Sequence, residues 1–252
     1  MSGKVSKSLQ FRDSCRFAVN NVARHGDTDV FPFPIENHIL FDLPDAAVDI
    51  MEGIHDGFAE SLKKMPPVRV TSFSAVGYNG FRSATQIDPL WNAYFLALVV
   101  DIGQDIEAAR LPREKGIVFS YRFMPDTSTW LMFDPNIGWR QYQDALISKA
   151  KQYEFVLACD IADFYPRIYH HRLKNALRKA TRKTNIVQRI MALLSRFSEG
   201  VSYGLPIGGP AARLLSELLL NRIDRLLLSH GIPYCRFVDD FHLFAIPFRK
   251  NE

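Results

Sequence analysis

The chain has 252 residues and a formal net charge of +4, from 31 basic and 27 acidic residues. Hydrophobic residues make up 47% and charged residues 23%, a composition that is typical of a folded protein and excludes a mainly disordered one. Three scattered cysteines with no Cys-x-x-Cys pair exclude a disulfide scaffold and the usual zinc fingers. The longest strongly apolar run, 93–100, is far shorter than the roughly 20 residues of a membrane span, and the first residues lack the apolar segment of a signal peptide. We therefore expect a soluble, cytoplasmic protein with no membrane partner.

The first 115 residues predict four elements and contain no motif with assignable chemistry. These are an extended segment over 31–41, a helix over 45–65, β-structure over 68–83 and a long buried helix over 88–110. Pro32 and Pro34 favour the extended segment, because the residue before a proline is disfavoured in a helix. Asp88 and Pro89 mark the start of the long helix, since aspartate caps a helix and proline fits its first position.

The remaining residues predict two strands, two helices and a hairpin. These are strands over 116–124 and 154–161, helices over 167–196 and 213–229, and a hairpin over 233–246 whose two-residue turn is Asp239-Asp240. The apolar run of the second strand is typical of a buried strand, and an Asp-Asp pair between two apolar runs is typical of a hairpin turn. This order predicts an α+β fold with helices on one face of an antiparallel sheet.

Positive charge is concentrated between Arg167 and Arg196, where nine basic residues occur without an acidic one. Solvated helix faces usually mix both signs, because opposite charges one turn apart support a helix. A stretch of one sign indicates a polyanionic partner such as a nucleic-acid backbone, and an ordinary basic surface is the alternative. The predicted nucleic-acid contacts are Arg172, Lys174, Arg178, Lys179, Arg182 and Lys183.

Three short segments carry residues that are suited to catalysis. They are ACDIADFYPRIYHHRL over 158–173, YGLPIGGPAARLL over 203–215 and YCRFVDDFHLF over 234–244. Taken singly, an aspartate after a strand, a Gly/Pro loop and an Asp-Asp turn are common structural features. Their combination is much more specific, because the aspartate, the Gly-Leu-Pro-x-Gly loop and the Phe-Val-Asp-Asp turn follow one another in that order.

In these segments the sequence resembles the reverse transcriptase family, the palm-type polymerases that copy nucleic acid into DNA. The resemblance covers roughly residues 116–246, and DIADFYPRIYHHRL and GLPIGGPAARLLSELLLNRID are most similar to bacterial abortive-infection and defence-associated members. It implies the fingers and palm of a right-hand polymerase. The implied division is an N-terminal extension and fingers over 1–115, fingers over 116–155 and a palm over 156–252, with the basic helical part at 168–200 bordering the fingers.

The aspartates of these motifs are the predicted catalytic residues. Nucleotidyl transfer is an in-line attack of a primer 3′-OH on an α-phosphate, which two divalent cations can promote. Mg²⁺ prefers oxygen ligands and keeps part of its shell for phosphates and water, so carboxylates from different strands suit it. We expect Asp160 and Asp239 to bridge two Mg²⁺ ions, with Mn²⁺ as a substitute, and Asp240 to complete or support the site. The backbone carbonyl of Ile161 is a further ligand by resemblance.

The resemblance also implies a nucleotide site. Tyr165 corresponds to the aromatic steric gate that fills the space of a ribose 2′-OH, which favours DNA synthesis and disfavours a viral-type RNA polymerase. The loop with Gly208 corresponds to the one under the template base and the incoming nucleotide. Asp163 is expected near the triphosphate through its backbone amide, or as a helix cap. Arg122, with Arg140 as the second choice, is the candidate for a γ-phosphate contact, because a guanidinium binds phosphate bidentately.

The sequence departs from the family pattern in two places. Ile207, also assigned to the nucleotide site, stands where the family loop usually has glutamine. Polar contacts near the template are therefore lost, and weakly templated or untemplated synthesis stays open. The chain ends 12 residues after Asp240, before the primer-gripping hairpin and thumb of the family. We expect the rest of the reading frame or another chain to supply the missing thumb.

Two pairs of residues beside the motifs are expected to have other roles. Cys159 and Cys235 are predicted to be reduced core residues, since free cysteine behaves as a small apolar side chain. His170 and His171 are predicted to be surface residues or phosphate contacts, because no partners for a metal site stand near them.

The predicted function is RNA-directed DNA polymerisation, in which dNTPs are added to a primer 3′ end on an RNA or DNA template, in bacterial anti-phage defence. The alternative is a catalytically incomplete nucleic-acid-binding or assembly fragment of a reverse transcriptase. The missing thumb and the basic stretch favour that alternative, and the intact set of aspartates argues against it.

Overall fold

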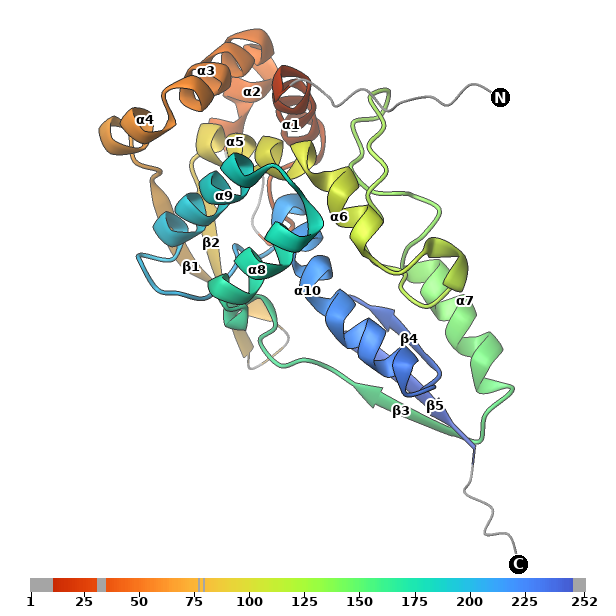
Figure 1. Ribbon diagram of the computed structural model, residues 1–252. Coiled ribbons are helices and arrows are strands. Elements are labelled where there is room, and N and C mark those ends of the chain that lie inside the picture. The colour runs from red at the N-terminus through yellow and green to blue at the C-terminus, as the bar shows by residue number, and fades with distance from the viewer. Residues whose placement is uncertain (1–10, 31–34, 77, 79, 247–252) are drawn as a thin grey trace, which may run out of the picture.

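The computed structural model describes residues 11–30, 35–76, 78 and 80–246 (Figure 1). Its first helices lie together at one end of the molecule, and they are α1 (Phe11–His25), α2 (His38–Asp42), α3 (Pro44–Asp56) and α4 (Phe58–Lys64). The helix expected over 45–65 is therefore confirmed, but it is divided at Gly57, a residue with low helix propensity. Helix α1 was not predicted from the sequence, and it buries Cys15, Ala18, Val19 and Val22 at helical spacing.

The extended segment expected over 31–41 is wrong where the structure describes it. Residues 35–41 form a short 3₁₀ helix (Ile35–Asn37) and most of α2, and residues 31–34 lie outside the described residues. The two prolines restrict only themselves and the residue before each, so they leave the chain free to turn helical after position 34.

The β-structure expected over 68–83 is an antiparallel hairpin of β1 (Arg69–Val76) and β2 (Gly80–Ile87). It is followed by α5 (Pro89–Asp101) and α6 (Gly103–Ala109), which together match the long helix expected over 88–110. The predicted cap is confirmed, because the backbone N–H of Trp91 donates to the Asp88 carboxylate at 3.0 Å. Helix α5 is apolar along its length and packs against α1 and α9, which makes it the central helix of the fold.

The strand expected over 116–124 is wrong. Val118 forms an isolated parallel bridge to Arg236, and Phe123 forms an isolated antiparallel bridge to Phe133. Between them Tyr121 has φ +46°, which interrupts an extended run although the side chains alternate. The next regular element is α7 (Trp139–Ala150), which packs against the sheet of the C-terminal part.

The C-terminal part combines a three-stranded antiparallel sheet with three helices, as predicted for an α+β fold. In chain order the elements are β3 (Phe155–Cys159), α8 (His170–Ala180), α9 (Thr184–Phe197), α10 (Pro210–Ser229), β4 (Tyr234–Phe237) and β5 (Asp240–Ala245). The strand order is β3-β5-β4, so β3 lies at an edge of the sheet (Figure 1). The helix expected over 167–196 is two helices, which separate at residues 181–183.

Strand β3 corrects one expectation about burial. Its apolar sequence predicts a buried strand, but all five of its residues are exposed, with Phe155 at 58% and Leu157 at 60%. Cys159, expected in the core, is exposed for the same reason, whereas Cys235 on β4 is buried as predicted. Composition alone does not distinguish a covered strand from an edge strand.

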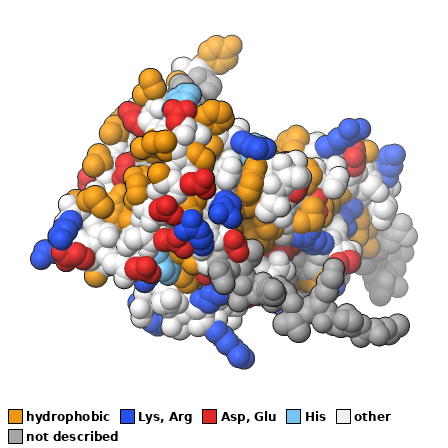
Figure 2. All heavy atoms as spheres, turned by 90° about the horizontal axis from the view of Figure 1, so that it is seen from above, with side chains coloured by type: hydrophobic (Ala, Val, Ile, Leu, Met, Phe, Trp, Pro, Cys, Tyr) orange, Lys and Arg blue, Asp and Glu red, His pale blue; other side chains and the backbone are white. Residues whose placement is uncertain are grey.

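One hydrophobic core joins the N-terminal helices to the C-terminal helices. It includes buried side chains of α1, α3, α5, α8, α9 and α10. Seen from above (Figure 2), the surface carries apolar side chains between interspersed acidic and basic ones. Within the described ranges, no helix is long and apolar enough to cross a membrane.

Candidate active site

All three sequence motifs contribute to one cleft of about 830 Å³. The first motif supplies Asp160, Ile161, Asp163 and Tyr165, the second supplies Ile207 and Gly208, and the third supplies Asp239 and Asp240. The β1–β2 hairpin forms another wall through Phe73 and Phe81. Apart from Arg122 and its second choice Arg140, the structure thus brings together every residue predicted for catalysis or nucleotide binding.

Sheet register places two of the aspartates opposite each other. Strands β3 and β5 pair antiparallel with Cys159 opposite Phe241 as the last pair, so Asp160 and Asp240 are the residues that come directly beyond it. The pKa of Asp240 is raised, first by burial and then by the negative charge of Asp160, while His242 acts in the opposite direction. Two carboxylates therefore meet at the end of the sheet and repel each other.

The hairpin turn begins one residue earlier than predicted. Phe237 pairs with Asp240, so the two turn residues are Val238 and Asp239, and Asp240 already belongs to β5. Val238 has φ +54°, which is uncommon for a β-branched residue. This turn presents Asp239 to the cleft at the tip and holds Asp240 beside it.

Tyr165 lies in the cleft with little freedom to move. It belongs to a short 3₁₀ helix (Tyr165–Arg167), and its backbone carbonyl accepts a hydrogen bond from Leu205 at 3.0 Å. The pKa of its hydroxyl is raised, mainly by burial and also by Tyr121, and a hydrogen bond with Ser216 acts against this. The backbone of Tyr165 is thereby tied to the second motif and its hydroxyl to α10.

Asp163 has φ +52° and lines the cleft. Its carboxylate accepts a hydrogen bond from the Arg167 side chain at 3.0 Å, one helical turn away. The alternative role expected for this carboxylate was a helix cap. No side-chain cap is formed on the 3₁₀ helix that follows. Its backbone amide remains the group predicted to face a triphosphate.

The Gly-Leu-Pro loop is fastened to the first motif by backbone and histidine contacts. The Gly204 N–H donates to the Ile168 carbonyl at 2.9 Å, and His170 Nε2 lies 2.8 Å from the Gly204 carbonyl. His170 is therefore buried and structural, which corrects its prediction as a surface or phosphate-contacting residue. His171 is exposed, as expected.

An N-terminal segment, residues 27–30, covers this loop. The Thr28 hydroxyl donates to the Ile207 carbonyl at 3.4 Å. Gly208 has φ +96°, and a Cβ there would lie 2.2 Å from Thr28 Oγ1 and 2.8 Å from Asp29 Oδ1. Only glycine fits this position, because the backbone conformation is left-handed and the segment leaves no space.

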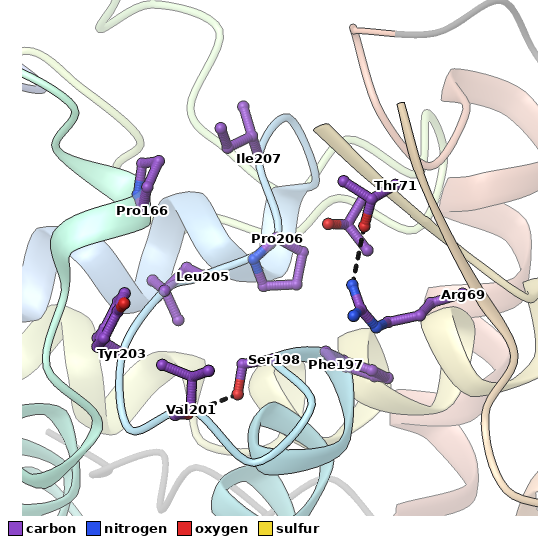
Figure 3. A pocket seen from close by; sticks show the side chains of 12 residues that line it. Arg69, Thr71, Pro166, Phe197, Ser198, Val201, Tyr203, Leu205, Pro206 and Ile207 are labelled. Carbon is purple, nitrogen blue, oxygen red and sulfur yellow. Dashed lines mark hydrogen bonds between the residues drawn. The ribbon is translucent and has the colours of Figure 1, made fainter. Parts of the chain in front are cut away.

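Figure 3 shows a smaller pocket of about 240 Å³ on the same loop. The side chains of Leu205 and Pro206 lie across it from Arg69 and Thr71 of β1, where Arg69 donates to Thr71 Oγ1 at 2.8 Å. This pocket shares Ile207 with the larger cleft. The loop therefore separates two hollows, and the β1–β2 hairpin lines both.

Arg122 does not lie in the cleft, which corrects its assignment to a γ-phosphate. It is 1% exposed, pairs with Glu107 at 3.2 Å and donates to the Leu111 carbonyl at 2.9 Å. A guanidinium buried in this way cannot reach a triphosphate. Arg140, the second choice, is exposed on α7 and is not among the residues that line the cleft.

Sequence reasoning missed Arg213, the one basic side chain among the described residues lining the cleft. It stands in the first turn of α10, forms an ion pair with Asp29, and lies over the Tyr121 ring at 5.1 Å. Its place four residues after the glycine pair of the loop, GGPAAR, was a usable signal, because the start of that helix had to border the nucleotide site.

The basic stretch is divided between exposed and paired side chains. Arg172, Arg178, Lys179 and Arg182 are exposed, and Lys174 is half-buried. Lys183 forms an ion pair with Asp101 at 2.9 Å and donates to the Asp101 carbonyl, so its ammonium is engaged within the fold. The sequence could not show this pairing, because Asp101 belongs to a distant helix.

Hard oxygen donors of the kind that Mg²⁺ prefers are present in the cleft. Within the described part of the chain, no three His, Cys, Asp or Glu side chains gather closely enough to hold a metal ion alone. The carboxylates still fit the ion, because a cation would relieve the repulsion between Asp160 and Asp240, and Mg²⁺ normally completes its shell with water and substrate phosphates.

A family model described as "Reverse transcriptase (RNA-dependent DNA polymerase)" matches residues 106–246. The chain belongs to the reverse transcriptase family, whose members are nucleotidyltransferases. No curated protein matches the chain. A solved structure described as "Partial Cas6-RT-Cas1--Cas2 complex" is similar with a TM-score of 0.43 and 18% identity. The match covers 96% of this chain and 39% of the chain in that complex, so this chain spans well under half the length of the chain that it matches. The family assignment rests on the family model.

Proposed function

We propose that this cleft is the polymerase site of an RNA-directed DNA polymerase that adds dNTPs to the 3′ end of a primer. The observation that supports the proposal is that Asp160, Asp239 and Asp240, from two strand ends and a hairpin turn, line one cleft. An isolated acidic turn would not need a second strand aligned with it in register. The proposed RNA or DNA template and primer would approach over the exposed basic side chains of α8 and residue 182.

The acidic side chains of the cleft are the proposed metal ligands. Asp160, Asp239 and Asp240, with the Ile161 carbonyl, would hold two Mg²⁺ ions, or Mn²⁺, through oxygen atoms. When bound, the ions would activate the attacking hydroxyl and stabilise the leaving pyrophosphate. The protein's own contribution is to hold the negative ligands at fixed positions before substrate arrives.

Two further residues would position the nucleotide. The fixed ring of Tyr165 would occupy the space of a ribose 2′-OH and so exclude ribonucleotides. Arg213 takes the place of Arg122 as the proposed phosphate contact, because its guanidinium lines the cleft and can exchange Asp29 for a phosphate oxygen. The Gly208 backbone would lie under the base pair, with Ile207 unable to make the polar contacts of a glutamine.

Incorporation of labelled dNTPs tests the proposal. The purified protein is incubated with Mg²⁺ on RNA and DNA primer–templates, and without a template. We expect incorporation by the wild-type protein and at least a roughly hundredfold loss in Asp239→Asn, since a metal ligand contributes several kcal/mol. Asp163→Asn is the matched control, because Asp163 lines the same cleft but its carboxylate pairs with Arg167.

Nucleic-acid binding without incorporation under every condition would refute polymerase activity and favour a binding or assembly role. We also propose a role in bacterial anti-phage defence, which rests on the similarity of the first two motifs to defence-associated members. It is tested by challenging bacteria that express the wild type or Asp239→Asn with phage. Equal protection by the two proteins would contradict a catalytic defence role.

A further inference from the structure

The turn that carries Asp239 is held in an unfavourable backbone conformation. Val238 has φ +54°, and the chain tolerates such a conformation only where its surroundings fix it. Val238 is 6% exposed, so its N–H and carbonyl need partners within the protein. The surroundings of this one residue therefore determine where Asp239 and Asp240 point.

Both backbone groups of Val238 are bound by buried side chains. Its N–H donates to the Ser120 hydroxyl at 3.0 Å, and its carbonyl accepts from Arg236 Nη1 at 2.9 Å. Ser120 and Arg236 are both fully buried. Ser120 comes from the irregular segment after Val118, and Arg236 comes from β4, so the turn is gripped from two sides.

Both of these side chains are anchored on Glu217 of α10. The Ser120 hydroxyl donates to Glu217 Oε1 at 2.6 Å, while Arg236 donates to Oε1 at 3.1 Å and to Oε2 at 3.0 Å. A serine hydroxyl has a single hydrogen, so donating it to the carboxylate leaves a lone pair for the Val238 N–H. Glu217 thus fixes the direction of the Ser120 hydroxyl hydrogen and the position of the Arg236 guanidinium.

The chemistry of the buried cluster requires Glu217 to be charged. Burial acts to raise its pKa, but the charges of Arg236 and Arg110 outweigh burial, and the net pKa is lowered. Arg110 donates to Oε2 at 2.6 Å. A neutral amide at this position would carry its own hydrogens and could compete for the Ser120 oxygen.

We propose that Glu217, acting through Ser120 and Arg236, is a positioning residue that holds the Val238 turn and thereby sets the geometry of Asp239 and Asp240. None of these three side chains is among the residues that line the cleft, so they act only through the turn. The consequence for catalysis rests on the proposed polymerase function, whereas the consequence for the turn does not.

The chain offers a matched control in Asp224. It is as buried as Glu217 and also accepts from Arg236, at Nε (2.9 Å) and Nη2 (2.6 Å). Its second partner is the Tyr234 hydroxyl, and no hydrogen bond joins it to Ser120 or Val238 among the described contacts. Asp224→Asn therefore weakens contacts of Arg236 at Nε and Nη2, and it leaves in place the Nη1 bonds to Val238 and Glu217 and the Ser120 bond to Val238.

The test is amide hydrogen exchange, measured by mass spectrometry on peptides that span residues 236–241, with no metal or substrate added. Ser120→Ala and Glu217→Gln should speed exchange in this segment by roughly fivefold or more relative to residues 242–245 of β5, because each loses a buried hydrogen bond. Asp224→Asn should leave that ratio near the wild-type value. In the incorporation assay, the first two variants should lower kcat more than they change KM for dNTP.

Unchanged exchange in Ser120→Ala and Glu217→Gln would overturn the inference, and so would an equal increase in Asp224→Asn. If Glu217→Gln does not fold, Ser120→Ala alone decides, since it removes one hydroxyl. A wild-type protein that incorporates no dNTP, while exchange follows the predicted pattern, would refute the proposed function and leave the positioning role standing.

Discussion

The position of Asp240, partly buried and beside Asp160, lowers the stability of the folded protein when its carboxylate is ionised. Its raised pKa means that the folded protein binds the proton more tightly than the unfolded chain, so stability is gained as pH falls through the folded pKa and lost as pH rises. At neutral pH the ionised carboxylate, facing Asp160, therefore destabilises the metal-free fold. We predict that Asp240→Asn raises the Tm at pH 7 in EDTA, and that the gain shrinks as the pH is lowered.

Thermal unfolding of the two proteins across pH measures this difference. The same variant should lose incorporation activity, which would separate the functional value of the charge from its structural effect. A Tm for Asp240→Asn that lies below the wild type at pH 7 would contradict the repulsion between the two carboxylates.

Tyr165 is predicted to select the sugar by the size of its ring. Tyr165→Ala should raise NTP incorporation relative to dNTP by roughly tenfold or more, because removing the ring opens space for one hydroxyl. Tyr165→Phe is the control, since it keeps the ring and loses only the hydroxyl that bonds Ser216. A selectivity that changes in Tyr165→Phe as much as in Tyr165→Ala would exclude a steric gate.

At the residue scale, the order of the motifs was enough to predict the catalytic aspartates. The sequence did not predict which arginine lines the cleft, because that depends on burial in the fold. The three aspartates could be located because strand ends and a hairpin turn recur at fixed places in the motifs. The sequence could not decide between Arg122 and Arg213 as the phosphate contact. Arg122 is buried and paired with Glu107, whereas Arg213 lines the cleft. Both facts arise from contacts between distant segments.

Among the elements, the contact between the 27–30 segment and the Gly-Leu-Pro loop is the one that can be probed most cleanly. Gly208→Ala should destabilise the protein by about 1 kcal/mol for the left-handed backbone and by a further 1–3 kcal/mol, approximately, for overlap with Thr28. Gly231→Ala is the control, because Gly231 has φ +66° and open space around it. Equal losses in the free energy of unfolding, measured in denaturant, would show that the segment does not cover the loop.

The elements themselves were predicted where the sequence has caps, breakers or strict periodicity. Asp88 and Pro89 located α5, and the apolar runs around the Asp-Asp pair located the β4–β5 hairpin. The hairpin turn was predicted one residue too late, because Val238 adopts a left-handed conformation that a valine in the sequence does not indicate. The same is true of Tyr121, which breaks an alternating segment that otherwise predicts a strand.

At the scale of the whole molecule, the exposed face of β3 is the feature that calls for a covering partner. Phe155 and Leu157 alternate onto one face of an edge strand and are 58% and 60% exposed. Exposed apolar edge strands favour association with another chain or segment. This is where we expect another chain to pack.

We predict that the 252-residue protein self-associates through this strand when nothing else covers it. Replacing Phe155 and Leu157 together by serine should lower the sedimentation coefficient at high concentration while changing the free energy of unfolding by only about 0.5 kcal/mol. Ile39→Ser, at a 43% exposed site on α2, is the control. A protein that stays monomeric at all concentrations, with or without the substitutions, would contradict the prediction.

The most direct test of the site is a crystal structure of the protein with Mn²⁺ and a non-hydrolysable deoxynucleoside triphosphate. We predict anomalous scattering from Mn²⁺ at the carboxylates of Asp160, Asp239 and Asp240, with the triphosphate against Arg213 and the sugar against the ring of Tyr165. Metal and nucleotide bound together anywhere outside this cleft would contradict it.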